Sequence, residues 1–263
     1  MTLLPAIIAS IAQTARWVDP KTFQRMPVWS PWMARGQAVY KADWVTRSQN
    51  TKKATSVATP RTEANIVAAQ ALMNALGIFG KKPRNWTVCH ILGYDDAGFS
   101  SSSIVSDPRF YSCVANMVWL PTPLKGFTDS MPEIKHMLRA CAYHLYGWAC
   151  EHPSAAAEAE RIRAGELPEG YPLAWPSPER PGLLPPGLCP YNDRIGAVIE
   201  REKTKLRAMM ENVALETFPR EQVNNVLHHW RLFLSADLTV SAAKPKPNAA
   251  KRAFGSLRLE GMS

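Results

Sequence analysis

The sequence predicts an α+β protein, in which a mainly helical chain surrounds one small pair of strands. Residues 62–76 and 129–148 carry apolar side chains at the three- and four-residue spacing of amphipathic helices. Between them, a polar loop rich in Ser and Asp separates two short apolar runs, 87–89 and 114–120. Short apolar runs bounded in this way are typical of strands. We therefore expect helix, strand, loop, strand and helix, in that order, in the middle of the chain.

The first 18 residues are expected to form an amphipathic helix that packs on the body of the protein. No basic segment precedes the apolar run, and polar or helix-breaking residues interrupt it, namely Pro5, Ser10, Gln13 and Arg16. A signal sequence needs that basic segment, and a membrane span needs an unbroken apolar stretch of about 20 residues. We therefore expect no membrane partner.

A basic loop precedes the first central helix. Residues 41–61 hold five Lys or Arg, including Lys52 and Lys53, against one acid. This composition suits a loop that contacts phosphates, and it equally suits a merely solvated loop. Thr62 is the expected N-cap of the following helix, with Glu63 in its first turn. Three cations then stand directly before the first strand: Lys81, Lys82 and Arg84.

The second half of the chain is expected to be helical on both sides of a proline-rich stretch. Residues 122–126 predict a turn, and the Ala- and Glu-rich residues 155–164 predict a short exposed helix. Eight prolines in residues 165–191 exclude regular helix or central strand, so this stretch is a linker or an extended arm on the surface. Two more helices are expected at 195–210 and 221–235.

These features divide the chain into five segments. They are an N-terminal helical and basic arm (1–60), a central core (61–153), a proline-rich linker (154–192), a C-terminal helical segment (193–237) and a basic, disordered tail (238–263).

Composition favours a polyanionic partner and a reducing compartment. The 263 residues carry a net charge of +9, and clustered Lys and Arg gain affinity for nucleic acid by releasing its condensed counterions. The five cysteines contain no CxxC pair. A disulfide framework is therefore not expected, and the cytoplasm is the expected location.

Two polar residues stand at the inner ends of the predicted strands. His90 ends the first apolar run and is followed by Ile91, and Asn116 opens the run Met117-Val118-Trp119-Leu120. On these residues the stretch 86–145 resembles the ββα-metal core of the HNH endonucleases. In that family two antiparallel strands and a helix hold one divalent ion. The resemblance implies that His90 is the general base that activates water, and that Asn116 ties the loop together through backbone hydrogen bonds.

The metal positions of the family are not matched in this sequence. Cys89 stands where the family carries an Asp or His ligand, and Lys125 stands where it carries a His or Asn ligand. A protonated lysine cannot bind a metal. Either Asp129 or His136 supplies the ligand, or Lys125 replaces the charge of the metal, or the site is inactive. The loop between the strands adds carboxylates for a cation and a guanidinium for the scissile phosphate: Asp95, Asp96, Asp107 and Arg109.

The resemblance implies a DNA endonuclease that needs a divalent metal, Mg²⁺ with Mn²⁺ as an alternative. RNA is not excluded as a substrate. Helices beyond a proline-rich arm suit a homodimer, and family habit suggests a part in phage defence. The rival interpretation is a noncatalytic nucleic-acid-binding protein on a degenerate HNH scaffold, in which His90 is structural. A third is a scaffold protein whose charge is incidental.

Overall fold

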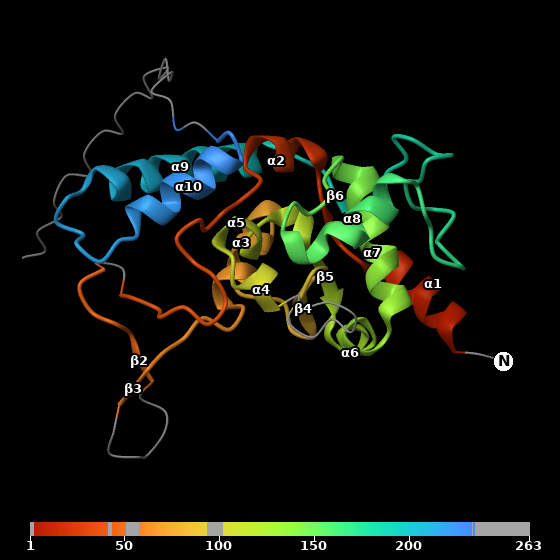
Figure 1. Cartoon of the computed structure of the whole chain (residues 1–263), viewed down its shortest axis with the longest axis horizontal. Coiled ribbons are helices and arrows are strands. Elements are labelled where there is room, and N and C mark those ends of the chain that lie inside the picture. The colour runs from red at the N-terminus through yellow and green to blue at the C-terminus, as the bar shows by residue number, and fades with distance from the viewer. Residues whose placement is uncertain (1–2, 42–43, 51–57, 94–101, 233, 235–263) are drawn as a thin grey trace, which may run out of the picture.

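The structure, a computed structural model, describes residues 3–41, 44–50, 58–93, 102–232 and 234 (Figure 1). It mixes helices and strands, which confirms the α+β class. The helices are α1 (Leu4–Thr14), α2 (Pro20–Arg25), α3 (Ile66–Ala75), α4 (Ser102–Val105), α5 (Pro108–Tyr111), α6 (Thr122–Ser130), α7 (Pro132–Tyr146), α8 (Ala156–Arg163), α9 (Asp193–Glu211) and α10 (Arg220–His229), with 3-10 turns at Val114–Asn116 and Pro153–Ala155. The strands are β1 (Trp17–Val18), β2 (Gln49–Asn50), β3 (Thr59–Pro60), β4 (Trp86–His90), β5 (Met117–Pro121) and β6 (Leu188–Cys189).

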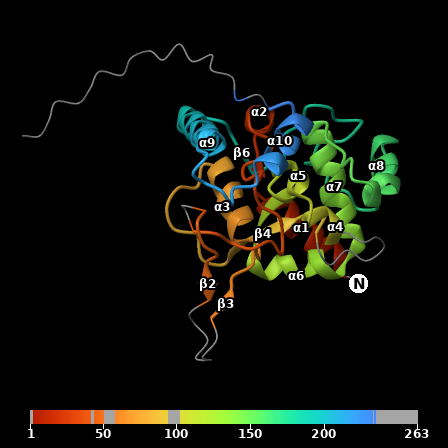
Figure 2. The same ribbon diagram turned by 60° about the vertical axis from the view of Figure 1, so that its left-hand side comes forward.

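Strands β4 and β5 form the antiparallel pair that the apolar runs predict. Trp86 pairs with Pro121 and His90 with Met117. β1 pairs in parallel with β6, and β2 pairs with β3 in an antiparallel hairpin that projects from the body (Figures 1 and 2).

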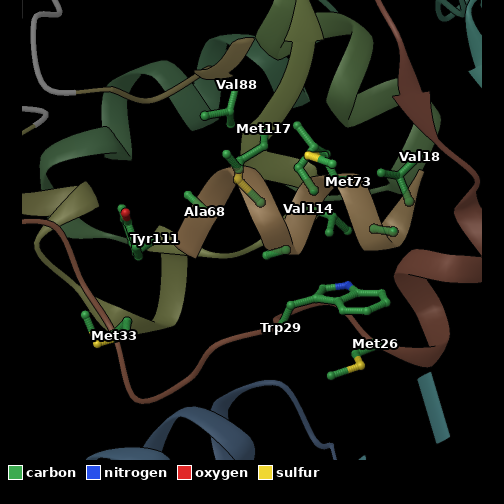
Figure 3. Close-up of a cluster of buried hydrophobic side chains, with 14 of the residues drawn as sticks. Val18, Met26, Trp29, Met33, Ala68, Met73, Val88, Tyr111, Val114 and Met117 are labelled. Carbon is green, nitrogen blue, oxygen red and sulfur yellow. The ribbon is translucent and has the colours of Figure 1, made fainter. Parts of the chain in front are cut away.

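The β4–β5 pair lies between two layers of helices. Because side chains alternate across a strand, Val88 and Met117 face one layer, where α3 contributes Ala68 and Met73 (Figure 3). Cys89, Val118 and Leu120 face the other layer, which contains Ile11 of α1 and Leu138 of α7. Both strand faces are therefore covered, and His90 ends a buried strand.

The first central helix begins later than the predicted N-cap at Thr62. Asn65 has a φ of +79°, in the left-handed region, so regular helix starts only at Ile66. The Glu63 carboxylate accepts a hydrogen bond from the backbone N–H of Val67 at 2.9 Å and thereby satisfies one free donor of the first turn. Ile66 belongs to the apolar pattern of residues 62–76, which predicts a buried face, but its side chain is 59% exposed.

The predicted turn at 122–126 is wrong, because these residues form the first part of α6. Pro123 is tolerated near the start of that helix, where backbone N–H groups lack partners in any case. Met131, with extended backbone, separates α6 from α7. The helix expected from residue 129 therefore begins at Pro132, and it ends before Gly147, whose φ is +67°.

The proline-rich stretch is the extended arm rather than a free linker. Trp175 is fully buried, and its indole N–H donates to the carbonyl of Ala12 in α1 at 3.3 Å. The ring of Trp175 meets that of Trp17 edge to face at 5.5 Å between centroids. The arm therefore fixes α1 against the body, as expected for an N-terminal helix packed on the protein.

The C-terminal helices are found where the sequence predicts them, with two differences. α10 ends at His229 rather than at residue 235. α8, expected to be exposed, buries Glu158 and Ile162. None of the described helices has both the length and the apolar character needed to cross a bilayer. The basic tail, like Lys52, Lys53, Asp95 and Asp96, lies outside the described residues.

Candidate active site at the end of strand β4

The His90 side chain is held in one orientation by Tyr111. Its Nε2 lies 2.8 Å from the backbone carbonyl oxygen of Tyr111, and the two rings stack with centroids 5.3 Å apart. Because a carbonyl oxygen can only accept, Nε2 carries the proton and Nδ1 holds the lone pair. The neutral tautomer is thus fixed, with Nδ1 as the atom able to accept a proton.

Tyr111 is fixed in turn by the segment before α3. Its hydroxyl donates to the buried carboxylate of Glu63 at 2.5 Å and accepts from the backbone N–H of Asn65 at 3.1 Å. Neither Glu63 nor Tyr111 could be assigned to the site from the sequence. The sequence marks Glu63 only as an acid near the start of a helix, and Tyr111, its partner, lies far along the chain.

Asn116 clasps the residues that follow His90. Its side-chain oxygen accepts from the N–H of Leu92 at 2.8 Å, and its amide donates to the carbonyl of Phe110 at 3.2 Å. Its backbone carbonyl also accepts from the N–H of Ile91 at 2.9 Å. This is the loop-tying geometry that the HNH resemblance implies for the asparagine, and its part in a reaction stays a prediction.

Asn116→Ala is expected to lower the free energy of unfolding by about 2–3 kcal/mol, because the buried N–H of Leu92 loses its side-chain acceptor. Urea unfolding followed by tryptophan fluorescence measures this. The matched control is Asn224→Ala on the exposed face of α10, expected to stay within about 0.5 kcal/mol of the wild type. Equal effects of the two substitutions would show that the clasp contributes nothing.

Two buried cations from α7 hold the same loop. Lys135 Nζ donates to the carbonyl oxygen of His90 at 3.2 Å, and Arg139 Nε donates to that of Ile91 at 3.3 Å. They lie one helical turn apart and so share a face of α7. Two cationic side chains therefore lie beside the end of β4.

This environment keeps His90 neutral. Burial is the main cause that lowers its pKa to about 4, and the charges of Lys135, Arg35 and Lys125 lower it further. The hydrogen bond to the Tyr111 carbonyl acts in the opposite direction. At neutral pH the imidazole therefore has its lone pair free to accept a proton.

Glu158 of α8 anchors Arg139. Its Oε1 lies 3.0 Å from the guanidinium of Arg139 and 2.7 Å from Nδ1 of His136. Burial by itself would raise the pKa of Glu158, but the hydrogen bonds and charges of His136 and Arg139 outweigh it and lower the pKa to about 2. The carboxylate is thus ionised and links α8, through Arg139, to the loop after His90. This network was not predicted, because α8 was expected to be exposed.

The predicted metal ligands do not converge. Cys89 faces the layer opposite to His90, and its thiol lies 3.1 Å from the hydroxyl of Thr128. His136 is bound to Glu158, whereas Lys125 and Asp129 form an ion pair with each other on α6. Among the described residues, no three His, Cys, Asp or Glu side chains form a metal-binding group. The described part of the chain therefore does not fit the implied Mg²⁺.

The remaining predicted site residues have other surroundings. The guanidinium of Arg109 forms a two-pronged ion pair with Asp107, at 2.6 and 2.9 Å, and does not point a free charge at a phosphate. Lys81, Lys82 and Arg84 are exposed at the other end of β4. Four strand residues separate that end from His90, roughly 13 Å.

No protein-family model matches the sequence, and comparisons with curated proteins and with solved structures give no match.

Proposed function

We propose that the protein is an HNH-like endonuclease that hydrolyses phosphodiester bonds in DNA, with His90 as the general base. One observation carries the proposal. His90 ends a strand with its tautomer fixed by Tyr111, while Asn116 clasps the next two residues. The HNH resemblance implies this arrangement for a general base and the asparagine that supports its loop.

The chemistry needs only a short sequence of events. Nδ1 of His90 takes a proton from water as the water oxygen forms a bond to phosphorus. The ester oxygen leaves as the P–O bond breaks and takes a proton from solvent water to become an alcohol. Negative charge grows on the phosphate during this step. The positive charge of Lys135, fixed beside the loop, favours that growth.

A second candidate is a noncatalytic nucleic-acid-binding protein on the same scaffold. The observation that favours it is the commitment of the expected ligands to other partners. Cys89 is buried on the opposite face, His136 is bound to Glu158, and Lys125 is paired with Asp129. In this case His90 and Asn116 only stabilise the loop.

A cleavage assay separates the two candidates. Plasmid DNA, single-stranded DNA and RNA are incubated with the wild type or His90→Ala in Mg²⁺, Mn²⁺ or EDTA. Cleavage that needs both a divalent ion and His90 supports the nuclease, with the ion held by groups other than the predicted ligands. Cleavage in EDTA that needs His90 supports a nuclease reaction without a metal. Binding without cutting under every condition favours the second candidate. The absence of both binding and cutting would exclude both.

A further inference from the structure

A basic groove lies where the end of α3 meets the first turns of α9. Gly77, just after α3, has a φ of +74°, and a Cβ atom there would lie 3.3 Å from the side chain of Ile195. The chain that leaves α3 toward β4 therefore runs directly beside α9, and Figure 2 shows the two helices as neighbours. Segments more than a hundred residues apart in sequence thus form one surface.

The groove encloses about 530 Å³ and has a basic wall. Its lining residues are Asn74, Phe79 and Gly80 on the α3 side, and Arg194, Ala197, Val198 and Arg201 on α9. The guanidinium of Arg194 lies 4.2 Å from the centroid of the Phe79 ring, a cation–π contact that holds the charge in place without neutralising it. An aromatic floor beside fixed arginines suits a nucleic acid better than a small inorganic anion.

The two arginines have the spacing of a phosphate chain. Arg194 and Arg201 are seven residues apart, so they lie on one face of α9 about 10.5 Å apart along its axis. Each strand of DNA rises about 3.4 Å per nucleotide, so this distance corresponds to roughly three nucleotides. Arginine is also the side chain that binds phosphate oxygens in two-pronged fashion.

The charge around the groove is predominantly positive. Glu202 accepts a hydrogen bond from Arg201 at 3.3 Å, but this exposed pair contributes little and can exchange for a phosphate. Asp193 precedes Arg194 by one residue and so points about 100° away around the helix. Beyond the lining residues, the same turn continues with three exposed cations: Lys81, Lys82 and Arg84.

We infer that this groove binds the phosphodiester backbone of DNA at a distance from His90, so that Arg194 and Arg201 position the substrate that the nuclease cuts. The inference rests on the proposed function for the identity of the polyanion. The three cations stand just before β4, and His90 ends that strand, which is roughly 13 Å long from Trp86 to His90. A bound DNA strand would cover the length of β4 with about four nucleotides.

The test is fluorescence anisotropy of a fluorescein-labelled DNA duplex of about 20 base pairs, titrated with the full-length protein in EDTA over a range of salt. Arg194→Gln and Arg201→Gln are each expected to weaken binding about tenfold near 0.1 M salt, and to reduce the slope of log affinity against log salt by about 1. The double variant should reduce the slope by about 2. The matched control is Arg163→Gln, an exposed helical arginine on α8, well apart from α9 in Figures 1 and 2.

Equal affinity and slope for the groove variants and Arg163→Gln would overturn the inference, even if the wild type cuts DNA. Weak binding by the groove variants, with a normal control, supports it. If the wild type then cuts no substrate under any metal condition, the groove stands and the proposed nuclease fails. The two hypotheses are therefore tested separately.

Discussion

Replacing His90 by glutamine is expected to lower the rate of DNA cleavage by about 10²–10⁴-fold, the contribution typical of a general base. Glutamine keeps an amide donor for the Tyr111 carbonyl but has no basic nitrogen. The clasp formed by Asn116 does not involve the His90 side chain, so the loop should keep its shape. Single-turnover cleavage of a plasmid, with DNA affinity measured in parallel, separates loss of chemistry from loss of binding.

The pH profile of cleavage gives a second test of His90 as the base. Because burial lowers the pKa of His90 to about 4, cleavage should fall on the acid side only near that pH and not near the usual histidine pKa of about 6.5. Any residual activity of His90→Gln should lack this acid limb. The matched control, His228→Gln on the exposed side of α10, should retain both rate and limb. Unchanged cleavage in His90→Gln would rule out His90 as the base.

The strand pair and its polar ends could be predicted from the sequence because the signals are local. Short apolar runs ending in His90 and opening at Asn116 predict two adjacent strands, and the register places His90 beside Met117, next to Asn116. The long helices α7 and α9 could be predicted for a similar reason, since each carries an apolar stripe at helical spacing.

The supports of the site could not be predicted, because they depend on pairings that leave no local pattern. Glu158 lies in an Ala- and Glu-rich stretch, a composition typical of an exposed helix, and only the fold brings Arg139 and His136 against it. Tyr111 donates to Glu63, far away in the sequence, and the Asn65 beside that contact takes a left-handed backbone conformation that delays α3. Lys125 was expected in the site only from its spacing after Asn116. In the structure, residues 122–126 begin helix α6 instead of forming a turn, and Lys125 pairs with Asp129 one helical turn further along.

Glu158→Ala is expected to lower the free energy of unfolding by about 3–5 kcal/mol, which is the largest stability effect that the described contacts suggest. Glu158, Arg139 and His136 are each less than 10% exposed, so removing the carboxylate takes a close counter-ion from a buried guanidinium. Urea unfolding at neutral pH measures the loss. The matched control is Glu160→Ala, an exposed glutamate two residues further along α8, expected within about 0.5 kcal/mol of the wild type.

The Glu158 carboxylate also makes the free energy of unfolding of the wild type decrease as the pH falls. The pKa of Glu158 is lowered from 4.5 to about 2 in the folded state, so its contribution is complete above about pH 4.5 and is lost as the pH falls toward 2. Glu158→Ala should therefore lose stability less steeply than the wild type over this interval. If Glu158→Ala and Glu160→Ala unfold alike at neutral pH, Arg139 does not depend on Glu158, and the loop after His90 must be fixed by Asn116 and Lys135 without help from α8.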